Sequence, residues 1–472
     1  MKTKDTSLNT IIVAILILAF SSFTEGQVIL YGLTSSGGTS NMGTVFSITP
    51  TGNLNVISNL NSIYAAMPNG SLLYASDGKF YASSLEGGYN DSCTIFSCTA
   101  NGTLATVINL DSVWGSSMPL GNSLIQGMDG NLYGMTYQGG PIKDSMFIEN
   151  GVIFKLQLSG QYTALHFFND TDGAKPAGSL IQTADGNLWG MTTSGGAYGS
   201  GTIFHCTTSG TFTSVFSFSI SDGTNPYGDL FLANDGNFYG MTSTGGAHNF
   251  GTLFRYTPLG TFTKLFDFND TNGAYPYGSL IQANDGNLYG LTSYGGTVYG
   301  GTHYDSVYHD TVNGAMSYGT LFKCTLSGTL TTLVSFNDTN GADPFGTLIQ
   351  ASDGNLYGMT YQGGLADSGT AFKYPLSGTL STVYKFGAYS GYTPMYGKLI
   401  EVDHLLSIDE LTNANAVKIY PNPNTGFFNV QLSPNNNKSS IEVYDLLGQQ
   451  VYQAPLNKAT TQLDLANNAS GI

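Results

Sequence analysis

The segment YGKLIEVD (residues 396–403) decides the fold, because it begins a repeat that the chain does not complete there. The segments YGSLIQAND (277–285) and FGTLIQASD (345–353) begin in the same way, and both continue into GNLYG. The copy at 396 stops before that continuation. An array of repeats that ends on the first part of a repeat needs a structural explanation.

The composition of the 472-residue chain is typical of a turn-rich β protein. Glycine occurs 62 times, tyrosine 30 times and phenylalanine 27 times, whereas charged residues make up only 10%. Hydrophobic residues, at 41%, are too frequent for a disordered chain. The formal net charge of -16 would repel a phosphate backbone, so nucleic acid is not expected as a partner.

Residues 1–26 have the layout of a signal peptide. Lys2 and Lys4 precede an apolar core over residues 11–20, which is too short to span a bilayer. No later segment reaches the length that a membrane-spanning helix needs. We therefore expect an exported chain whose mature form has no membrane-spanning segment.

A repeat of roughly 50 residues follows the leader, marked by seven double glycines at equivalent positions. The unit that starts at Gly278 contains four β-prone runs, SLIQ, NLYGLTS, TLFKCT and LTTLVSF, separated by glycine-containing turns. This pattern predicts a four-stranded antiparallel meander. Such a unit cannot bury both faces alone, so the units stack either as a linear solenoid or as a closed β-propeller.

The two ends of the array distinguish these architectures. The first copy, VILYGLTSSGG (28–38), starts in its second strand, and YGKLIEVD supplies a first strand without a second. Together they complete seven units. The sequence therefore predicts an all-β, seven-bladed propeller over residues 27–403, closed by strands from both termini.

The repeats, with YG(L/M)T, a double glycine and then GT(L/I/V)F, resemble the Gloeo/Verruco glycine-rich tandem repeat of exported bacterial proteins. They are more distantly similar to kelch blades, which also carry a double glycine. The resemblance covers residues 28–403 and implies a propeller. It does not name a function, because propellers serve as binders, scaffolds and enzymes alike.

The segment 416–472, which follows a linker at 404–415, is similar to the C-terminal sorting domain of the type IX secretion system. KIYPNPNTG (418–426) and IEVYDLLGQQV (441–451) carry the resemblance, and the alternating runs suggest a small β-sandwich. The resemblance implies recognition by the type IX machinery and a secreted or cell-surface location. That family normally continues past SGI (470–472), so we expect the end of the domain to be missing. The motif residues are Lys418, Tyr420, Pro421, Asn422, Pro423 and Gly426.

Length variation falls on the connections after the second and fourth strands, which share one face of a propeller. The longest is the loop at 297–318, whose aromatic, His and Asp residues could bind a sugar ring or a transition metal. The alternative is a surface insertion whose tyrosines pack on the propeller rim. The candidate ligand-binding residues are Tyr299, His303, Tyr304, Asp305, Tyr308, His309 and Asp310.

The connections after the fourth strand repeat a pattern such as FNDTNGAYP, which offers oxygen ligands for calcium. The alternative is that Asn and Asp cap the turns before glycine. No other cofactor is expected. The candidate calcium ligands are Asp170, Asp172, Asp270, Asn272, Asp338 and Asn340.

The leading hypothesis is an exported binding or adhesion protein that uses this face for a glycan or a protein. A secreted carbohydrate-active enzyme, a lyase or hydrolase with His303, His309 or a nearby Asp as acid and base, is the alternative. A spacer without a small ligand is the third possibility. The sequence contains no G-x-S-x-G motif and only one arginine, Arg255, so it does not favour catalysis.

Overall fold

The computed structural model describes residues 15–16, 28–88, 93–110, 123–140, 142–143, 146–147, 150–298, 303–305, 310–312, 317–395, 397–402, 418–420, 427–431, 439–444, 450–456 and 460–464. The chain divides into two compact units. One comprises Glu25–Val402, and the other comprises Met1–Thr24 together with Asp403–Ile472.

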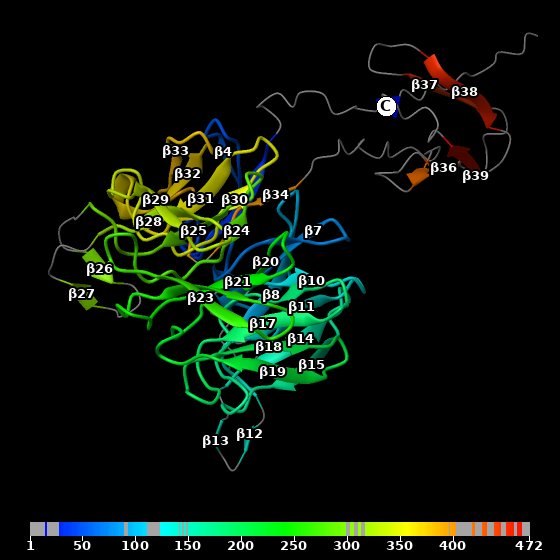
Figure 1. Ribbon diagram of the computed structural model, residues 1–472. Helices are drawn as coiled ribbons and strands as arrows, with labels where there is room; N and C mark the ends of the chain where they lie inside the picture. Colours follow the sequence, from blue (N-terminus) through cyan, green and yellow to red (C-terminus); the bar gives the residue numbers. More distant parts are fainter. Residues whose placement is uncertain are drawn as a thin grey trace, which may run out of the picture. The chain divides into compact units, whose positions relative to one another are not determined.

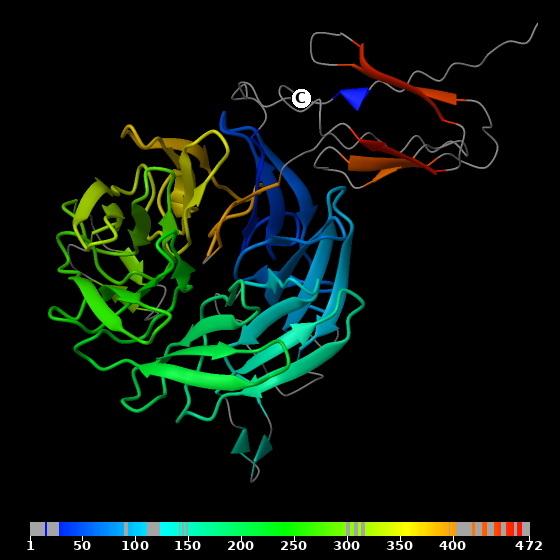
Figure 2. The same cartoon turned by 45° about the vertical axis from the view of Figure 1, so that its right-hand side comes forward.

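Seven antiparallel sheets form the blades of a β-propeller in the larger unit (Figure 1). Figure 2 shows them following one another around a central axis. Blade 4 gives the pattern, with its strands paired in chain order: β16 (Ile181–Gln182), β17 (Leu188–Thr192), β18 (Thr202–Cys206) and β19 (Phe212–Ser217). The first strand of each blade is therefore shorter than the sequence predicts.

The other complete blades repeat this order. Blade 3 consists of β10 (Ile125–Gln126), β11 (Leu132–Thr136), β14 (Val152–Leu156) and β15 (Tyr162–Phe167). Blade 5 consists of β20 (Phe231–Leu232), β21 (Phe238–Thr242), β22 (Thr252–Tyr256) and β23 (Phe262–Asp267). Blade 6 consists of β24 (Ile281–Gln282), β25 (Leu288–Thr292), β28 (Thr320–Cys324) and β29 (Leu330–Ser335). Blade 7 consists of β30 (Ile349–Gln350), β31 (Leu356–Thr360), β32 (Thr370–Tyr374) and β33 (Ser381–Lys385).

Blade 2 and the connections carry the additional elements. In blade 2, β5 (Ala66–Pro68) and β6 (Leu73–Tyr74) both pair with β7 (Lys79–Glu86), which is followed by β8 (Thr94–Thr99) and β9 (Leu104–Asn109). Ribbons are inserted after the second strand of blade 3, as β12 (Ile142–Lys143) and β13 (Met146–Phe147), and of blade 6, as β26 (His303–Asp305) and β27 (Asp310–Val312). A short 3-10 helix, η1 (Leu365–Asp367), follows β31.

Blade 1 is assembled from both ends of the propeller sequence. Its first strand is β34 (Ile400–Glu401), which pairs with β2 (Leu30–Thr34), and β3 (Thr44–Ile48) and β4 (Leu54–Asn59) complete the sheet. Leu30 lies opposite Glu401, and Tyr31 lies opposite Ile400. The prediction that the fragment at 396 closes a seven-bladed ring is confirmed.

A circle of hydrogen bonds links the first strands around the central axis. In each link a backbone N–H donates to the side-chain oxygen at the same repeat position of the next blade. The links are Ser71 to Ser123, Ser123 to Ser179, Ser179 to Asp229, Asp229 to Ser279 and Ser279 to Thr347, at 2.5–3.1 Å. Lys398 donates its N–H to Ser71 Oγ at 2.9 Å, so β34 holds the place of an ordinary first strand. The Lys398 side chain has no oxygen to accept from Thr347, so the circle is open between blades 7 and 1.

The hydrophobic core lies between neighbouring blades. The second strand of blade 4, LWGMT, is buried along its whole length because both of its faces are covered. Between blades 3 and 4, Tyr133 and Met135 pack with Phe204 and Cys206. Each blade thus buries its apolar faces against its neighbours, as the repeat pattern predicts.

The smaller unit contains two three-stranded sheets. One consists of β35 (Lys418–Tyr420), β36 (Phe427–Gln431) and β39 (Thr460–Asp464). The other consists of β1 (Ile15–Leu16), β37 (Ser439–Tyr444) and β38 (Gln450–Leu456). Among the described residues, no helix is both long enough and apolar enough to cross a membrane.

Candidate functional site

The connections of the blades separate onto two faces because successive strands run in opposite directions. We call the face with the turns after the first and third strands the turn face. The loop face carries the connections after the second and fourth strands. The chain enters β2 near Val28 and leaves β34 near Val402, and both points are on the turn face.

Carboxylates on the turn face are held in hydrogen-bonded networks. In blade 3, Asp129 accepts hydrogen bonds from Tyr133 Oη at 2.8 Å, Lys155 Nζ at 2.9 Å and the Asn131 backbone N–H at 3.1 Å. Burial alone would raise the pKa of Asp129, but these donors hold that pKa well below its usual range. Burial together with Asp129 raises the pKa of Tyr133 to about 12. These groups stabilise the turn.

The double glycines and the Asp residues of the loop face join neighbouring blades. The backbone oxygens of Asp170, Asp270 and Asp338 each accept a hydrogen bond at 2.7 Å from the second glycine of the next blade. All three Asp residues have positive φ, between 63° and 70°, which Asp tolerates better than most residues. Their placement shows a structural role in the contact between blades.

Three of the side chains proposed for calcium, those of Asp172, Asn272 and Asn340, already cap turns. Asn272 Oδ1 accepts from the Asn269 N–H at 3.1 Å, and Asn340 Oδ1 accepts from the Asn337 N–H at 3.0 Å. Asp172 lies 3.0 Å from His166, measured from Oδ2 to Nε2. Burial raises the pKa of Asp270. Within the described residues no group of three or more His, Cys, Asp or Glu is placed to hold a metal, and the calcium site stays a prediction.

The residues predicted to bind a ligand lie mostly outside the described residues. This holds for Tyr299, Tyr308 and His309, and for the side chains of His303, Tyr304, Asp305 and Asp310. The backbone forms the ribbon β26–β27, in which Tyr304 lies opposite Thr311. Of the sorting motif, only the backbone of β35 is described.

The structure adds two groups of side chains that the sequence did not reveal. On the loop face, Tyr227, Tyr277 and Phe345 follow the prolines before the first strands, with ring centroids 5.2 and 5.4 Å apart. The sequence signal for this group was that each of the three aromatic residues directly follows a proline. The second group consists of exposed large hydrophobic residues on the same face, five of them in its loops and Met67 in β5: Ile63, Tyr64, Met67, Tyr198, Ile220 and Tyr389.

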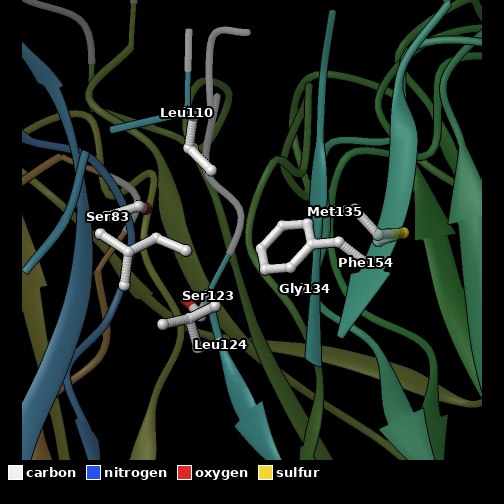
Figure 3. A pocket seen from close by; sticks show the side chains of 8 residues that line it. Ser83, Leu110, Ser123, Leu124, Gly134, Met135 and Phe154 are labelled. Carbon is white, nitrogen blue, oxygen red and sulfur yellow. The ribbon is translucent and has the colours of Figure 1, made fainter. Parts of the chain in front are cut away.

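A small buried pocket lies between blades 2 and 3 (Figure 3). Leu110, Leu124, Met135 and Phe154 make its lining largely apolar, and Ser83 and Ser123 contribute hydroxyl groups. Its free space is on the order of one water molecule, which is too small for an organic ligand. The pocket is therefore a packing gap between blades, and the candidate site remains the surface of the loop face.

Comparisons with known families support both parts of the chain. The model of the Gloeobacter/Verrucomicrobia repeat matches residues 20–148, 143–306 and 303–408. The model of the secretion system C-terminal sorting domain matches residues 418–472. No curated protein matches the sequence.

One solved structure with a TM-score above 0.5 has a similar fold at low sequence identity, and a second is similar at a lower score. A 6-phosphogluconolactonase candidate from Bacteroides fragilis is 17% identical, with a TM-score of 0.51, over 81% of this chain and 100% of that one. The virginiamycin B lyase from Staphylococcus aureus is 14% identical, with a TM-score of 0.42, over 71% and 88%. At such identity the likeness concerns the fold alone and assigns no substrate.

Proposed function

The chain belongs to the Gloeobacter/Verrucomicrobia repeat family, and on this premise we propose that it is a binding or adhesion protein whose loop face holds a glycan or protein ligand. The sorting domain makes it a secreted or cell-surface protein. In this proposal residues 1–26 act as its signal peptide, and the type IX secretion machinery recognises the sorting domain.

The difference between the two faces carries the proposal. On the turn face the carboxylates of blades 2, 3, 5, 6 and 7 accept a hydrogen bond from the tyrosine four residues further along the chain. The loop face, in contrast, carries both inserted ribbons. Insertions on a rigid scaffold commonly carry binding residues.

The ribbon of blade 6 is the proposed ligand-binding element, because its segment combines tyrosine with His and Asp. Aromatic rings stack on the apolar face of a sugar, and the polar groups fix its orientation. The side chains proposed to do so are Tyr299, His303, Tyr304, Asp305, Tyr308, His309 and Asp310.

A glycan array and a pull-down with labelled surface proteins test this proposal. Removing residues 297–318 and joining the ends with a short glycine linker should abolish binding. The matched control removes residues 141–149, the other ribbon segment on the same face, and should bind like the intact chain. A variant without 297–318 that binds as well as the intact chain would refute the placement of the site.

A further inference from the structure

Exposed apolar side chains gather over blade 1 on the loop face. We define the closing-blade patch as Met42, Ile63, Tyr64, Met67 and Tyr389. The exposed fraction is 91% for Tyr389, 69% for Ile63, 38% for Tyr64 and 37% for Met67, and Met42 is half-buried. Side chains of this size are rarely left in water together without a partner.

Three loops that bear the patch are joined by hydrogen bonds. The loop after β2 lies between the other two: Gly38 N–H donates to Ala388 O at 2.9 Å, and Met42 O accepts from Met67 N–H at 2.9 Å. Thr44 Oγ1 also donates to Ser390 O at 3.0 Å. The three loops are therefore held in fixed positions relative to one another, which lowers the entropy cost of docking.

The fold does not require apolar residues at these positions. Ile63 and Tyr389 occupy the loop position that Thr171, Thr271 and Thr339 fill in other blades. The residue before each of these threonines accepts the same hydrogen bond from the next blade as Ala388, which precedes Tyr389, so a hydroxyl at the tip is compatible with that contact. Solubility alone would favour a polar residue, so the hydrophobic tips indicate a binding role.

The sequence around the patch carries no charge. Residues 27–76 and 386–397 contain no Asp, Glu, Lys, Arg or His, in a chain whose formal net charge is -16. The loops consist largely of Tyr, Ser, Gly, Asn and Met. Tyr, Ser, Gly and Asn dominate antibody binding loops, and depletion of charge marks the centre of protein interfaces.

We propose that the closing-blade patch docks a second copy of this chain, patch against patch, about a two-fold axis. An apolar and uncharged surface is complementary to itself, as a two-fold interface requires. Two chains that each carry a net charge of -16 can approach most closely where neither presents a charge. Repulsion between the more distant charges is screened beyond about 8 Å at physiological salt.

The charges that border the patch also suit a two-fold arrangement. Glu86, opposite Ala66 in the pairing of β5 with β7, is exposed on the blade 2 side. Lys385, the last residue of β33, is exposed on the blade 7 side. A two-fold axis that lies in the interface at right angles to the line from Glu86 to Lys385 exchanges these sides, and this orientation sets Glu86 of one copy opposite Lys385 of the other.

This inference rests on the proposed function, because it names one partner of the loop face. Sedimentation equilibrium of the whole chain tests it at concentrations up to about 100 μM. The intact chain should form a dimer. Ile63→Asp and Tyr389→Asp should each raise the dimer dissociation constant at least about tenfold, because each variant places a buried charge opposite its own copy.

The matched control is Leu259→Asp, at a leucine that is 97% exposed on the turn face. It should leave the dissociation constant unchanged. Thermal melting should show all three variants folded, because the replaced side chains are solvent-exposed. Dimerisation should also persist at high salt, since apolar contact rather than charge attraction holds the interface.

A chain that stays monomeric over this range would refute the inference, as would a dimer that Ile63→Asp and Tyr389→Asp leave intact. If both variants lose glycan binding while the oligomeric state is unchanged, the patch binds glycans and the second copy is excluded. A monomer that still binds a glycan or protein through residues 297–318 would refute this inference and leave the proposed function standing.

Discussion

Closure of the ring by β34 makes a quantitative prediction for Leu399. Its side chain is 1% exposed and lies in the core cluster that includes Phe46. A Cβ atom added to Gly32 would come within 2.9 Å of it, so the leucine sits directly on the glycine of the neighbouring strand. Replacing a buried leucine by alanine costs about 2–5 kcal/mol. We expect that loss for Leu399→Ala.

Leu280 provides the matched control. It is 2% exposed and packs in the same way on Gly290 in blade 6, where the chain is continuous. If the strand from the C-terminal end is an ordinary member of the ring, Leu399→Ala and Leu280→Ala should lower the free energy of unfolding by similar amounts. Urea titration followed by the fluorescence of Trp189, which is buried in blade 4, measures both.

Deleting residues 397–402 should cost more than either substitution. It also removes the pairing with β2, the Lys398 link to Ser71 and the hydrogen bonds from Ser352 to Glu401. The total is comparable to the whole stability of a domain, about 5–15 kcal/mol, so blade 1 should not form. Truncation after residue 417 should leave the unfolding curve of the propeller unchanged. A Leu399→Ala variant as stable as the intact chain, beside a destabilised Leu280→Ala, would refute the closure.

Three further predictions concern single side chains. Thr136 Oγ1 is buried and has no hydrogen-bond partner among the described residues, because Val152 stands where other blades pair two hydroxyl groups. Val152→Thr should add about 0.5–1.5 kcal/mol to the free energy of unfolding in urea titration, and no gain would contradict this. Burial opposes the ionised form of Asp285, but hydrogen bonds from Asn287 and Tyr289 lower the pKa of its carboxyl group. Its contribution to stability should therefore be complete above about pH 4 and be lost as pH falls through the lowered pKa. The melting temperature of Asp285→Asn should accordingly decline less in acid than that of the intact chain. Burial raises the pKa of Asp270, so Asp270→Asn should raise the melting temperature at pH 7 with EDTA present, and an equal gain at pH 3 would contradict this reasoning.

The sequence was sufficient to predict the fold because the repeats show which segments occupy equivalent positions in successive blades. The incomplete copies at 28 and 396 complement each other, and this counting identified the partner of β2 across the whole propeller. The short first strands were predicted too long because apolar residues such as Leu180 continue the pattern without continuing the pairing. A hydrophobic pattern predicts which side chains are buried, whereas the length of a strand depends on which backbone groups form hydrogen bonds.

The candidate site was harder to predict for a physical reason. The Asp and Asn residues of the loop face were predicted as calcium ligands. In the structure the backbone oxygen of Asp270 accepts a hydrogen bond from the next blade, and the side-chain oxygen of Asn272 caps a turn. Ile63 and Tyr389 were not predicted as binding residues, because a single hydrophobic residue in a loop forms no recognisable sequence pattern. Only the folded ring brings residues more than three hundred positions apart onto one surface.

The exit of the chain at the turn face determines how the propeller responds to force. If the C-terminal domain keeps the protein at the cell surface while a ligand holds the proposed site on the loop face, the propeller is placed under tension. That tension enters the propeller at Val402 and acts on β34, which is paired with β2 through two residue pairs. Two residue pairs provide few backbone hydrogen bonds to resist this load. Blade 1 is therefore the element expected to open first under load, and it is also the blade that carries the exposed apolar surface.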